Sequence, residues 1–463
     1  MSASWDGRRV VILGAARQGQ ALARYLTRHG ARVCLSDVRT EAELQAVRQA
    51  LADLPIEWAL GGHPLELLQG ADLLCLSGGV PTTLPIVQEA VRRGIPLSND
   101  TQIFMEVVPC RTAGITGSAG KTTTTSLVGE MARLTVREHG TFRRVFVGGN
   151  IGDPLLNYVD EMQPDDLAIL EISSFQLEQM SRSPNIAAVL NITPNHLDRH
   201  GSMEAYIAAK ARILEFQSSQ DVAVLGREDA NAWSLRTRVR GRLLSFGFGA
   251  LEGEASGTYY RDGLLYLYER QVDIPLLGRH QLHLRGDHNV LNVLAAFAIG
   301  AGIGLPLDAM LEAAMNFRGV PHRLELVREW RGVRWYNDSI ATAPERTMAA
   351  IRSFEEPLIL LLGGRDKNLP WDDLARLVRQ RVDHVILFGE AAEKIERAIR
   401  AAEGERPYTL ERYAHLFEAV QAAARLAESG DVVLLSPGGT SFDEFRDFEE
   451  RGERFREWVQ QLS

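Results

Sequence analysis

The sequence predicts an α/β protein of three domains. Short apolar runs alternate with segments of helical periodicity along the chain, and most of the runs end in a turn rich in Gly, Ser or Asp. This alternation is typical of βαβ units with parallel sheets. The length of 463 residues also suggests about three domains. We expect a Rossmann-like N-terminal domain over residues 1–107, a central domain over 108–318 with a parallel sheet, a phosphate loop and a small β excursion, and a Rossmann-like C-terminal domain over 319–463.

Composition and charge predict a soluble cytoplasmic protein. Hydrophobic residues make up 45% of the chain, charged residues make up 24%, and the formal net charge is -9. A negative balance argues against a nucleic acid or an anionic membrane as the main partner. No apolar run approaches the roughly 18 to 20 residues that span a bilayer. The three cysteines, Cys34, Cys75 and Cys110, lie in apolar surroundings and indicate reduced core thiols.

The N-terminal stretch has the pattern of a Rossmann βαβ unit. The apolar run Val10–Leu13 leads into the turn Gly14–Gly19, and a helix connects this turn to a second strand, Arg32–Ser36, which ends at Asp37. An acidic residue about 20 positions beyond the first glycine is typical of dinucleotide-binding units. Ala16 replaces the middle glycine, however, so a nucleotide sugar or a purely structural unit fits this stretch as well as NAD does.

Residues 115–125 carry a phosphate-loop pattern, Ile-Thr-Gly-Ser-Ala-Gly-Lys-Thr-Thr-Thr-Thr. A glycine loop between a strand and a helix lets backbone N–H groups and the helix N-terminus surround phosphate oxygens, as in P-loop ATPases. Lys121 would neutralise phosphate charge, and the Thr122 hydroxyl can reach a bound Mg²⁺. Ile115 stands where the first glycine of the full motif would be, so this stretch alone leaves a chance loop open.

Two apolar strands nearby end in groups that suit a magnesium ion. The run 167–170 is followed by Glu171, and the run 186–192 is followed by His196. Taken singly, Glu171 could be a helix N-cap and His196 a turn residue. Because the ends of parallel strands meet at one edge of a sheet, the two side chains would face the phosphate loop together. Jointly with Lys121 they predict a Mg²⁺ shell.

Lysine is scarce in this chain. Of 51 basic residues only four are lysine, namely Lys121, Lys210, Lys367 and Lys394. A chain that uses arginine almost everywhere keeps lysine mainly where a guanidinium cannot substitute. Lys394 lies in a helical stretch rich in Ala, Glu and Arg and is expected at the surface. The other three fall inside motifs, so we expect each of them to have a function.

The second half of the chain carries further polar turns. Residues 240–285 alternate short apolar segments with turns, which predicts the β excursion. The helix that follows carries Asn289 and Asn292 on one face, either as a hydrogen-bonding pair or as base-recognition groups. In the last third, strands end in the turns 337–339 and 436–443. This pattern predicts another parallel sheet with ligand groups at one edge.

Taken in order, these motifs resemble those of the Mur ligases of peptidoglycan synthesis. The resemblance covers essentially the whole chain and rests on eight segments, which are Gly117–Thr123, Gly148–Gly152, Glu171–Leu177, Asn191–Thr193 with His196, Lys210, His288–Asn289 with Asn292, Pro321–Arg323 and Asn337–Ser339. Each segment is weak alone, but the ordered set is specific. Ser173–Glu178 and the ending Ser441–Gly452 are most similar to the members that add glutamate.

The resemblance implies an ATP-dependent, amide-bond-forming ligase. The expected reaction adds D-glutamate to UDP-N-acetylmuramoyl-L-alanine through an acyl phosphate, with a pair of Mg²⁺ ions and a carbamylated Lys210. Lys121, Glu171, His196 and Lys210 are the implied catalytic residues. The implied partners are the UDP substrate, glutamate and ATP. We expect a monomer that binds neither nucleic acid nor membrane.

The resemblance also carries site residues over to this chain. The implied ATP contacts are Gly117, Ser118, Ala119, Gly120, Lys121, Thr122, Thr123, Asn289, Asn292, Arg323 and Asp338. The implied contacts of the UDP substrate are Gly14, Ala15, Ala16, Arg17, Asp37, Arg39, Ser77, Gly78, Gly79, Asn150 and His196. Glutamate would meet Thr342, Lys367, Ser441, Phe442 and Phe448, and the metal ligands would be Thr122, Glu171, His196 and Lys210. Addition of CO₂ would give Lys210 an anionic oxygen, which an arginine could not provide.

One position departs from the family pattern and leaves the amino acid open. The stretch that reads Asp-Ser-Lys-Ala-Thr-Asn in similar members is Asp338–Ala343 here, with Ile340 in place of a lysine that helps hold glutamate. L-Glutamate is therefore an alternative to D-glutamate. Two other classes fit less well. A nucleotide-binding regulatory protein would need neither Lys210 nor Lys367, and a folylpolyglutamate synthetase usually lacks a unit like 1–107.

Overall fold

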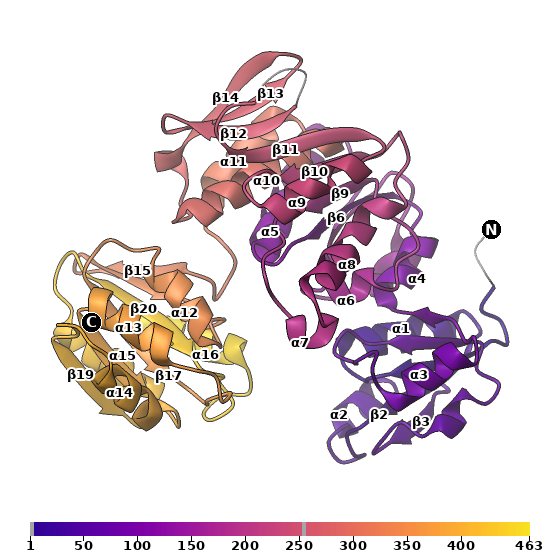
Figure 1. The fold of residues 1–463 in the computed structure, drawn as a ribbon, viewed down its shortest axis with the longest axis horizontal. Coiled ribbons are helices and arrows are strands. Elements are labelled where there is room, and N and C mark those ends of the chain that lie inside the picture. The colour runs from indigo at the N-terminus through magenta and orange to yellow at the C-terminus, as the bar shows by residue number, and fades with distance from the viewer. Residues whose placement is uncertain (1–3, 252–255) are drawn as a thin grey trace. The chain divides into compact units, whose positions relative to one another are not determined.

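The structure, a computed structural model, describes residues 4–251 and 256–463. Its strands form three β-sheets, each accompanied by helices (Figure 1). The chain divides into two compact units, one made of Met1–Leu282 with His288–Asn316 and the other of His283–Asp287 with Phe317–Ser463. The predicted α/β class is confirmed, and the domain boundaries at 107/108 and 318/319 stay predictions. None of the described helices is long and apolar enough to cross a membrane.

The first sheet of the larger unit has five parallel strands in the order β3-β2-β1-β4-β5. These strands are β1 (Arg9–Leu13), β2 (Arg32–Asp37), β3 (Glu57–Leu60), β4 (Leu73–Leu76) and β5 (Leu97–Ser98). The α-helices are α1 (Arg17–Arg28), α2 (Gln45–Ala50), α3 (Pro85–Arg92) and α4 (Asp100–Val107), with a 3₁₀ turn, η1 (Leu65–Leu68). β1 and β2 match the predicted strands, and the residues of β1, β2 and β4 are almost all buried, as expected of central parallel strands.

The second sheet has nine strands in the order β14-β13-β12-β11-β10-β9-β6-β8-β7. These strands are β6 (Arg111–Thr116), β7 (Val145–Gly149), β8 (Leu167–Glu171), β9 (Ile186–Val189), β10 (Val222–Gly226), β11 (Arg242–Phe248), β12 (Gly257–Arg261), β13 (Leu264–Glu269) and β14 (Val272–Gly278). β12, β13 and β14 form an antiparallel meander, which confirms the β excursion predicted within 240–285. Residues 252–255 of that stretch lie outside the described residues.

Helices and short turns connect the strands of the second sheet. They are α5 (Lys121–His139), η2 (Leu155–Glu161), α6 (Ser174–Leu177), α7 (Leu197–His200), α8 (Met203–Glu215), α9 (Ala230–Ser234), η3 (Leu235–Arg238), η4 (Arg279–Gln281), α10 (Asp287–Ile303) and α11 (Leu307–Asn316). The parallel order β8-β6-β9 brings the carboxyl ends of three strands together. The phosphate-loop pattern follows β6, Glu171 ends β8, and Asn191 follows β9.

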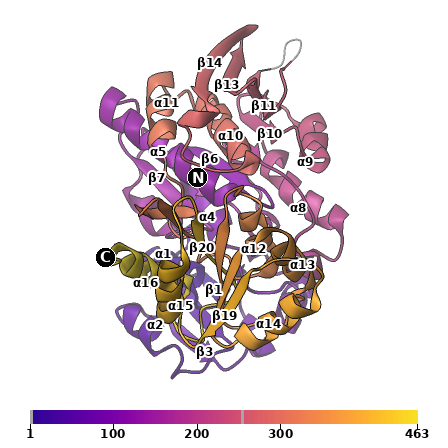
Figure 2. The same cartoon turned by 90° about the vertical axis from the view of Figure 1, so that its left-hand side faces the viewer.

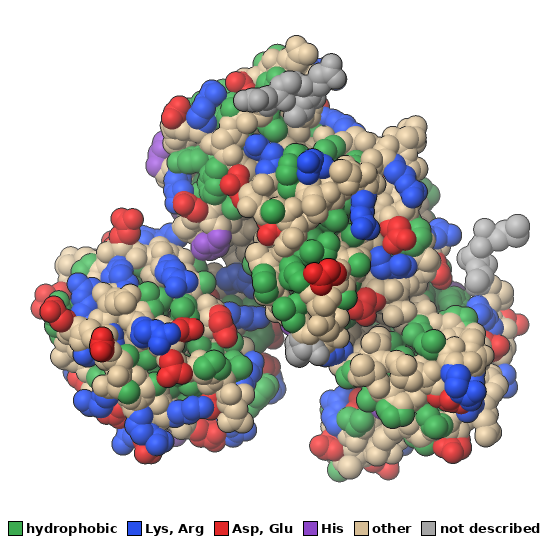
Figure 3. All heavy atoms as spheres, viewed as in Figure 1, with side chains coloured by type: hydrophobic (Ala, Val, Ile, Leu, Met, Phe, Trp, Pro, Cys, Tyr) green, Lys and Arg blue, Asp and Glu red, His purple; other side chains and the backbone are tan. Residues whose placement is uncertain are grey.

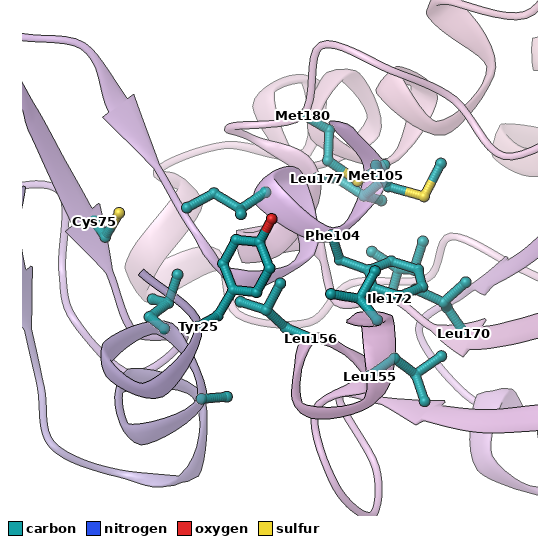
Figure 4. Close-up of a cluster of buried hydrophobic side chains, with 14 of the residues drawn as sticks. Tyr25, Cys75, Phe104, Met105, Leu155, Leu156, Leu170, Ile172, Leu177 and Met180 are labelled. Atoms are coloured by element: carbon teal, nitrogen blue, oxygen red, sulfur yellow. The ribbon is translucent and has the colours of Figure 1, made fainter. Parts of the chain in front are cut away.

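A continuous cluster of buried apolar side chains joins the two sheets of the larger unit (Figure 4). Tyr25 of α1 and Phe104 of α4 belong to it, together with Leu156, Ile172 and Leu177 from the central sheet's connections. Burying one side chain of this size stabilises the fold by about 1.5–3 kcal/mol. The shared cluster explains why both sheets fall into one compact unit.

The cysteines are inert core residues in this structure. Cys34, Cys75 and Cys110 are all buried and free, which confirms the prediction of reduced thiols. Burial raises the pKa of the Cys34 and Cys110 thiols to about 11, so both stay protonated near neutral pH.

The smaller unit contains a six-stranded sheet in the order β15-β16-β20-β17-β18-β19. Its strands are β15 (Glu325–Trp330), β16 (Val333–Asn337), β17 (Leu358–Gly363), β18 (His384–Phe388), β19 (Thr409–Tyr413) and β20 (Val432–Gly438). Its helices are α12 (Pro344–Ile351), α13 (Asp372–Arg381), α14 (Ala392–Ala401), α15 (Leu416–Leu426) and α16 (Phe448–Gln460). In the second view α12, α13 and α14 lie on one side of this sheet and α15 and α16 on the other (Figure 2), and separate apolar clusters fill the two faces.

One strand of this sheet differs from the sequence-based expectation. β15 pairs antiparallel with β16, whereas the sequence predicted only parallel pairing. The two strands are joined at Arg331 and Gly332, whose φ angles are 54° and 77°. Two successive left-handed residues are typical of a two-residue hairpin turn. β15 escaped prediction because it is a partly exposed edge strand with charged residues and no continuous apolar run.

Candidate functional site

The phosphate loop connects β6 to α5 and is held by side chains from the next strand connection. The Ala119 N–H donates to Asn191 Oδ1 at 2.8 Å, and Asn191 Nδ2 donates to the Ala119 carbonyl at 3.1 Å. The Ser118 N–H donates to the Asn191 carbonyl at 2.9 Å. Asn191 therefore holds the backbone of Ser118 and Ala119 in one conformation. The loop is thereby preorganised for an anion.

Gly120 ends the loop in a conformation that favours glycine. Its φ is 82°, and a Cβ added there would lie 2.2 Å from Asn292 Oδ1. Asn292 in turn donates from Nδ2 to Asn289 Oδ1 at 3.0 Å, and both asparagines are buried on α10. The structure thus brings the predicted asparagine pair against the phosphate loop. Ser118 also contacts Tyr206, with 3.0 Å between the hydroxyl oxygens.

Lys121 and Lys210 share one acceptor at the bottom of the loop. Lys121 Nζ donates to the Gly117 carbonyl at 2.8 Å, and Lys210 Nζ donates to the same oxygen at 3.0 Å and to Thr116 Oγ1 at 3.3 Å. Lys210 is 1% exposed, and its ammonium lies 4.9 Å from the centre of the Tyr206 ring. Burial, followed by repulsion from Lys121, lowers the pKa of Lys210 well below its usual value. Burial thus shifts the protonation equilibrium of Lys210 toward the neutral amine.

Glu171, at the end of β8, is the carboxylate of this site. Its Oε2 accepts from Thr122 Oγ1 at 2.8 Å, and its Oε1 accepts from Asn150 Nδ2 at 2.8 Å. The alternative that Glu171 is a helix N-cap is wrong, because Ser173 is the N-cap of α6. Lys121, Thr122, Asn150, Glu171 and Lys210 thus converge, although they come from four separate segments.

This convergence fits a magnesium ion bound beside a phosphate. A hydroxyl and a buried carboxylate meet at the start of α5, and they are hard oxygen donors of the kind that Mg²⁺ takes. Among the described residues, no three His, Cys, Asp or Glu side chains form a ready-made cage. Mg²⁺ does not need one, because it usually keeps waters and substrate oxygens in its shell.

His196 packs against Phe175, a residue that lines a pocket. It is the N-cap of α7 with a φ of 52°, and its ring centroid is 5.3 Å from that of Phe175. Phe175 also stacks on His200 and carries the Arg199 guanidinium 4.6 Å above its ring. Phe175 and Arg199 line a pocket together with Ser77 and Gly78. The predicted His196–Glu171 ligand pair stays a prediction.

The turn after β1 is shaped by one buried carboxylate. Asp37 Oδ2 accepts from the Ala15 N–H at 2.7 Å, and both carboxylate oxygens accept from the Arg39 guanidinium at 2.9 and 3.0 Å. Burial alone would raise the pKa of Asp37, but the hydrogen bonds from Arg39 and Ala15 outweigh it and lower the pKa. Asp37 therefore fixes the turn and orients Arg39 as an exposed cation.

The other predicted residues of the N-terminal site surround the same turn. Gly14 has a φ of 92°, and Ala16 is the N-cap of α1. The Arg17 guanidinium donates to the Gly152 carbonyl at 3.1 Å. The Gly78 N–H donates to Gln18 Oε1 at 2.7 Å, and Arg199 reaches the Gly79 carbonyl at 3.5 Å. The sequence analysis missed Gln18, because it is an uncharged residue within the turn 14–19, and Arg199, because it stands outside the strand-end turns.

The smaller unit holds a second cluster at the carboxyl end of β16. Asp338 is buried; its Oδ2 accepts from Ser436 Oγ at 2.8 Å and its Oδ1 from the Leu324 N–H at 3.2 Å. Burial raises the pKa of Asp338 to about 7, although these hydrogen bonds and the charge of Arg323 act in the opposite direction. Arg323 and Asp338 thus belong together, in a different unit from the phosphate loop.

The predicted glutamate residues follow three neighbouring strands of this sheet. Lys367 Nζ donates to Thr342 Oγ1 at 3.3 Å, which joins the turns after β16 and β17. Ser441, after β20, is buried, whereas Phe442 is 60% exposed. Phe448 begins α16, and its carbonyl accepts from Ser339 Oγ at 2.7 Å. Side chains at the carboxyl ends of adjacent parallel strands are where open α/β sheets bind ligands.

Arg451 is a fully buried guanidinium that ties these turns together. It donates to the Ser339 carbonyl at 2.8 Å, to the Gly439 carbonyl at 3.2 Å and to the Thr440 carbonyl at 3.0 Å. Burial lowers the pKa of Arg451 to about 10. This role could not be predicted from the sequence, because Arg451 is one of several arginines in a charged helix.

The fold and the site together define a nucleotide-dependent enzyme with a phosphate loop and three α/β sheets. Three sequence profiles match the chain in order. They are described as "Mur ligase MurD-like, N-terminal domain" over residues 8–99, "Mur ligase middle domain" over 115–300 and "Mur ligase, glutamate ligase domain" over 322–439.

Full-length relatives agree with the profiles. A UDP-N-acetylmuramoylalanine--D-glutamate ligase of Symbiobacterium thermophilum is 41% identical and covers 98% of each chain. Proteins of the same name from Koribacter versatilis and Acetivibrio thermocellus are 38% and 37% identical, and they cover 99% and 98% of this chain and 98% and 97% of their own. The chain belongs to the Mur ligase family, in its MurD group.

Solved structures show the same fold. The chain is similar to the UDP-N-acetylmuramate-alanine ligase MurC of Thermotoga maritima, with a TM-score of 0.58, 20% identity and coverage of 98% of this chain and 99% of that one. It is also similar to MurF of Thermotoga maritima in complex with ADP, with a TM-score of 0.56, 17% identity and full coverage of both chains.

Proposed function

We propose that this protein is the ATP-dependent ligase that adds D-glutamate to UDP-N-acetylmuramoyl-L-alanine in cytoplasmic peptidoglycan synthesis. One feature of the site carries this function. Lys121, Thr122 and Glu171 meet at a phosphate loop, and a buried Lys210 lies beside them. The relatives at 37–41% identity are D-glutamate ligases by name, which favours D-glutamate over L-glutamate in spite of Ile340.

The proposed reaction has two chemical steps. In the first, an oxygen of the substrate carboxylate attacks the γ-phosphorus of ATP, so that a P–O bond forms to the carboxylate and the bond to ADP breaks. In the second, the glutamate amine attacks the acyl carbon, and the tetrahedral intermediate expels inorganic phosphate and a proton, which leaves an amide. The first step brings two anions together, so the site must concentrate positive charge there.

The residues at the phosphate loop would supply this charge and hold the nucleotide. Residues 117–123 would contact the phosphates of ATP, through backbone N–H groups at the start of α5 and through the Lys121 ammonium. Thr122 and Glu171 would hold Mg²⁺, with His196 as a further ligand by the family resemblance. Bound Mg²⁺ supplies a cation that neutralises charge developing on the phosphoryl oxygens. Asn289, Asn292, Arg323 and Asp338 are proposed adenine and ribose contacts.

Lys210 is proposed to act as a carbamate. The neutral amine nitrogen attacks CO₂, an N–C bond forms, and one proton leaves to solvent, so that the product is an anionic oxygen ligand. The low pKa of Lys210 supports this step, because only the neutral amine is nucleophilic. The carbamate would complete the Mg²⁺ shell with Thr122, Glu171 and His196.

The UDP substrate is proposed to bind at the carboxyl ends of β1, β2 and β4. The turn 14–17 with Asp37 and Arg39 would hold the uridine diphosphate, and Ser77, Gly78 and Gly79 would flank it. Asn150 and His196 would lie at the alanyl end. Glutamate is proposed to bind in the smaller unit at Thr342, Lys367, Ser441, Phe442 and Phe448. We also propose that the enzyme is a monomer.

Phosphate release from ATP tests this function. The purified protein would be assayed with UDP-N-acetylmuramoyl-L-alanine and either D-glutamate or L-glutamate, with the products analysed by mass spectrometry. We expect turnover with D-glutamate and none with its L-enantiomer. Turnover with L-glutamate alone would indicate that Ile340 belongs to an amino-acid site specific for L-glutamate. Absence of turnover with either would contradict the proposed reaction.

A further inference from the structure

The turn Ile340–Thr342 in the smaller unit carries cations on two sides. The Arg346 guanidinium donates from Nη1 to the Ile340 carbonyl at 3.1 Å, and the Thr342 N–H donates to the same carbonyl at 2.9 Å. On the other side, Lys367 Nζ donates to Thr342 Oγ1 at 3.3 Å. Three consecutive residues thus link a guanidinium and an ammonium that come from different segments of the chain.

Within residues 4–251 and 256–463, neither Arg346 nor Lys367 is held in an ion pair with Asp or Glu, although the charge of the buried Asp338 acts on Arg346. Arginines elsewhere on this unit form such ion pairs repeatedly, as in Arg365–Glu390 and Arg376–Asp373. Burial lowers the pKa of Lys367, and repulsion from Arg346 and Arg451 adds to the effect. Cations without an ion-pair partner at the carboxyl ends of parallel strands form a site for an anion.

The backbone fixes Arg346 in this place. Pro344 is the first residue of α12, and the Arg346 N–H donates to the Ala343 carbonyl at 3.1 Å. Among the residues that the structure describes, the Arg346 guanidinium donates one hydrogen bond, to the Ile340 carbonyl. A guanidinium has five N–H donors in a planar fork, so an exposed edge can still bind a carboxylate through two parallel hydrogen bonds.

We propose that Arg346 is a specificity-determining residue of the amino-acid site and binds one carboxylate of the incoming glutamate. This inference rests on the proposed function, because it assigns a contact to the same site. Glutamate carries two carboxylates, and a single ammonium at Lys367 would leave one of them without a cation. Arg346 supplies the second cation beside Ile340, a position that itself has no charge to offer.

The experiment compares Arg346→Gln with the wild-type enzyme. The readouts are kcat and KM for D-glutamate, together with inhibition constants for its two monoamides, D-glutamine and D-isoglutamine. Loss of a charge-assisted hydrogen bond should weaken glutamate binding, so KM for D-glutamate should rise about 10- to 100-fold. KM for ATP and KM for the UDP substrate should stay unchanged. The preference for glutamate over one of the monoamides should fall by a similar factor. Arg346→Lys should give an intermediate KM.

Arg352→Gln is the matched control, because Arg352 is an exposed arginine at the other end of α12. It should leave every constant unchanged. An unchanged KM for D-glutamate in Arg346→Gln, or an equal loss of affinity for glutamate and both monoamides, would overturn the assignment of Arg346 while leaving the proposed function intact. A wild-type enzyme with no D-glutamate turnover would overturn both.

Discussion

Replacing Lys210 tests the chemistry and the electrostatics of the site together. The side chain is 1% exposed, and its ammonium shares the Gly117 carbonyl with Lys121. Lysine tolerates this environment because it can give up its proton, as its lowered pKa indicates. Arginine cannot be deprotonated, so Lys210→Arg would place a permanent charge in a buried position next to another cation.

The structure sets the expected size of the effect. An uncompensated buried charge costs about 3–5 kcal/mol, so we expect Lys210→Arg to lower Tm by roughly 5–10 °C. Lys210→Met keeps the side-chain length without a charge and should change the free energy of unfolding by only about 1 kcal/mol. Both variants should lose ligation by about 10³-fold or more, because neither can form a carbamate.

Two measurements separate the outcomes. Phosphate release would be followed in buffer depleted of CO₂ and again after bicarbonate is added, and binding of the UDP substrate would be measured by calorimetry. Bicarbonate should restore the wild-type enzyme and neither variant, and Lys210→Met should bind the UDP substrate normally. Near-normal ligation by Lys210→Arg would refute the carbamate role, and an unchanged Tm in that variant would refute the electrostatic reasoning.

Three further predictions concern single positions. Ile340→Lys should lower KM for D-glutamate by adding a cation to the amino-acid site; steady-state kinetics would show this, and an unchanged KM would place Ile340 outside that site. Asp338→Asn should stabilise the protein at pH 8 by about 2–4 kcal/mol, because the unfolded carboxyl loses its proton near pH 4 whereas the folded one holds it up to about pH 7. Below about pH 4 the carboxyl is protonated in both the folded and the unfolded state, so the gain should vanish there. Urea titrations at both pH values would reveal a pH-independent gain if the reasoning is wrong. Gly120→Ala should raise KM for ATP and destabilise the fold by about 1–3 kcal/mol, because the added Cβ meets Asn292 and the backbone keeps a positive φ; thermal unfolding and ATP kinetics equal to those of the wild type would contradict this.

Charged side chains are interspersed with apolar and polar ones over the face drawn in Figure 3. Many of the basic groups are arginines paired with a neighbouring Asp or Glu, as in Arg92–Glu89 and Arg400–Glu396. Such exposed pairs contribute little to stability individually.

Several parallel strands and the phosphate loop could be predicted from the sequence alone, whereas the strand order of each sheet could not. Apolar runs predicted β1, β2, β8 and β9, because a buried parallel strand needs apolar side chains on both faces. The loop at 117–123 could be predicted because phosphate binding requires glycine for the tight loop, lysine for the phosphate charge and threonine for Mg²⁺. The scarcity of lysine also pointed to Lys210 without any knowledge of its surroundings.

The contacts between charged side chains became known only from the tertiary structure. Lys121 and Lys210 share the Gly117 carbonyl, although they lie in different helices, and burial at that point lowers the pKa of Lys210. In the same way, Arg346 reaches the carbonyl of an apolar residue beside Lys367. The pKa of a group and the net charge of a site depend on distances and burial among segments far apart in the chain, and periodicity and spacing along the sequence carry no information on either.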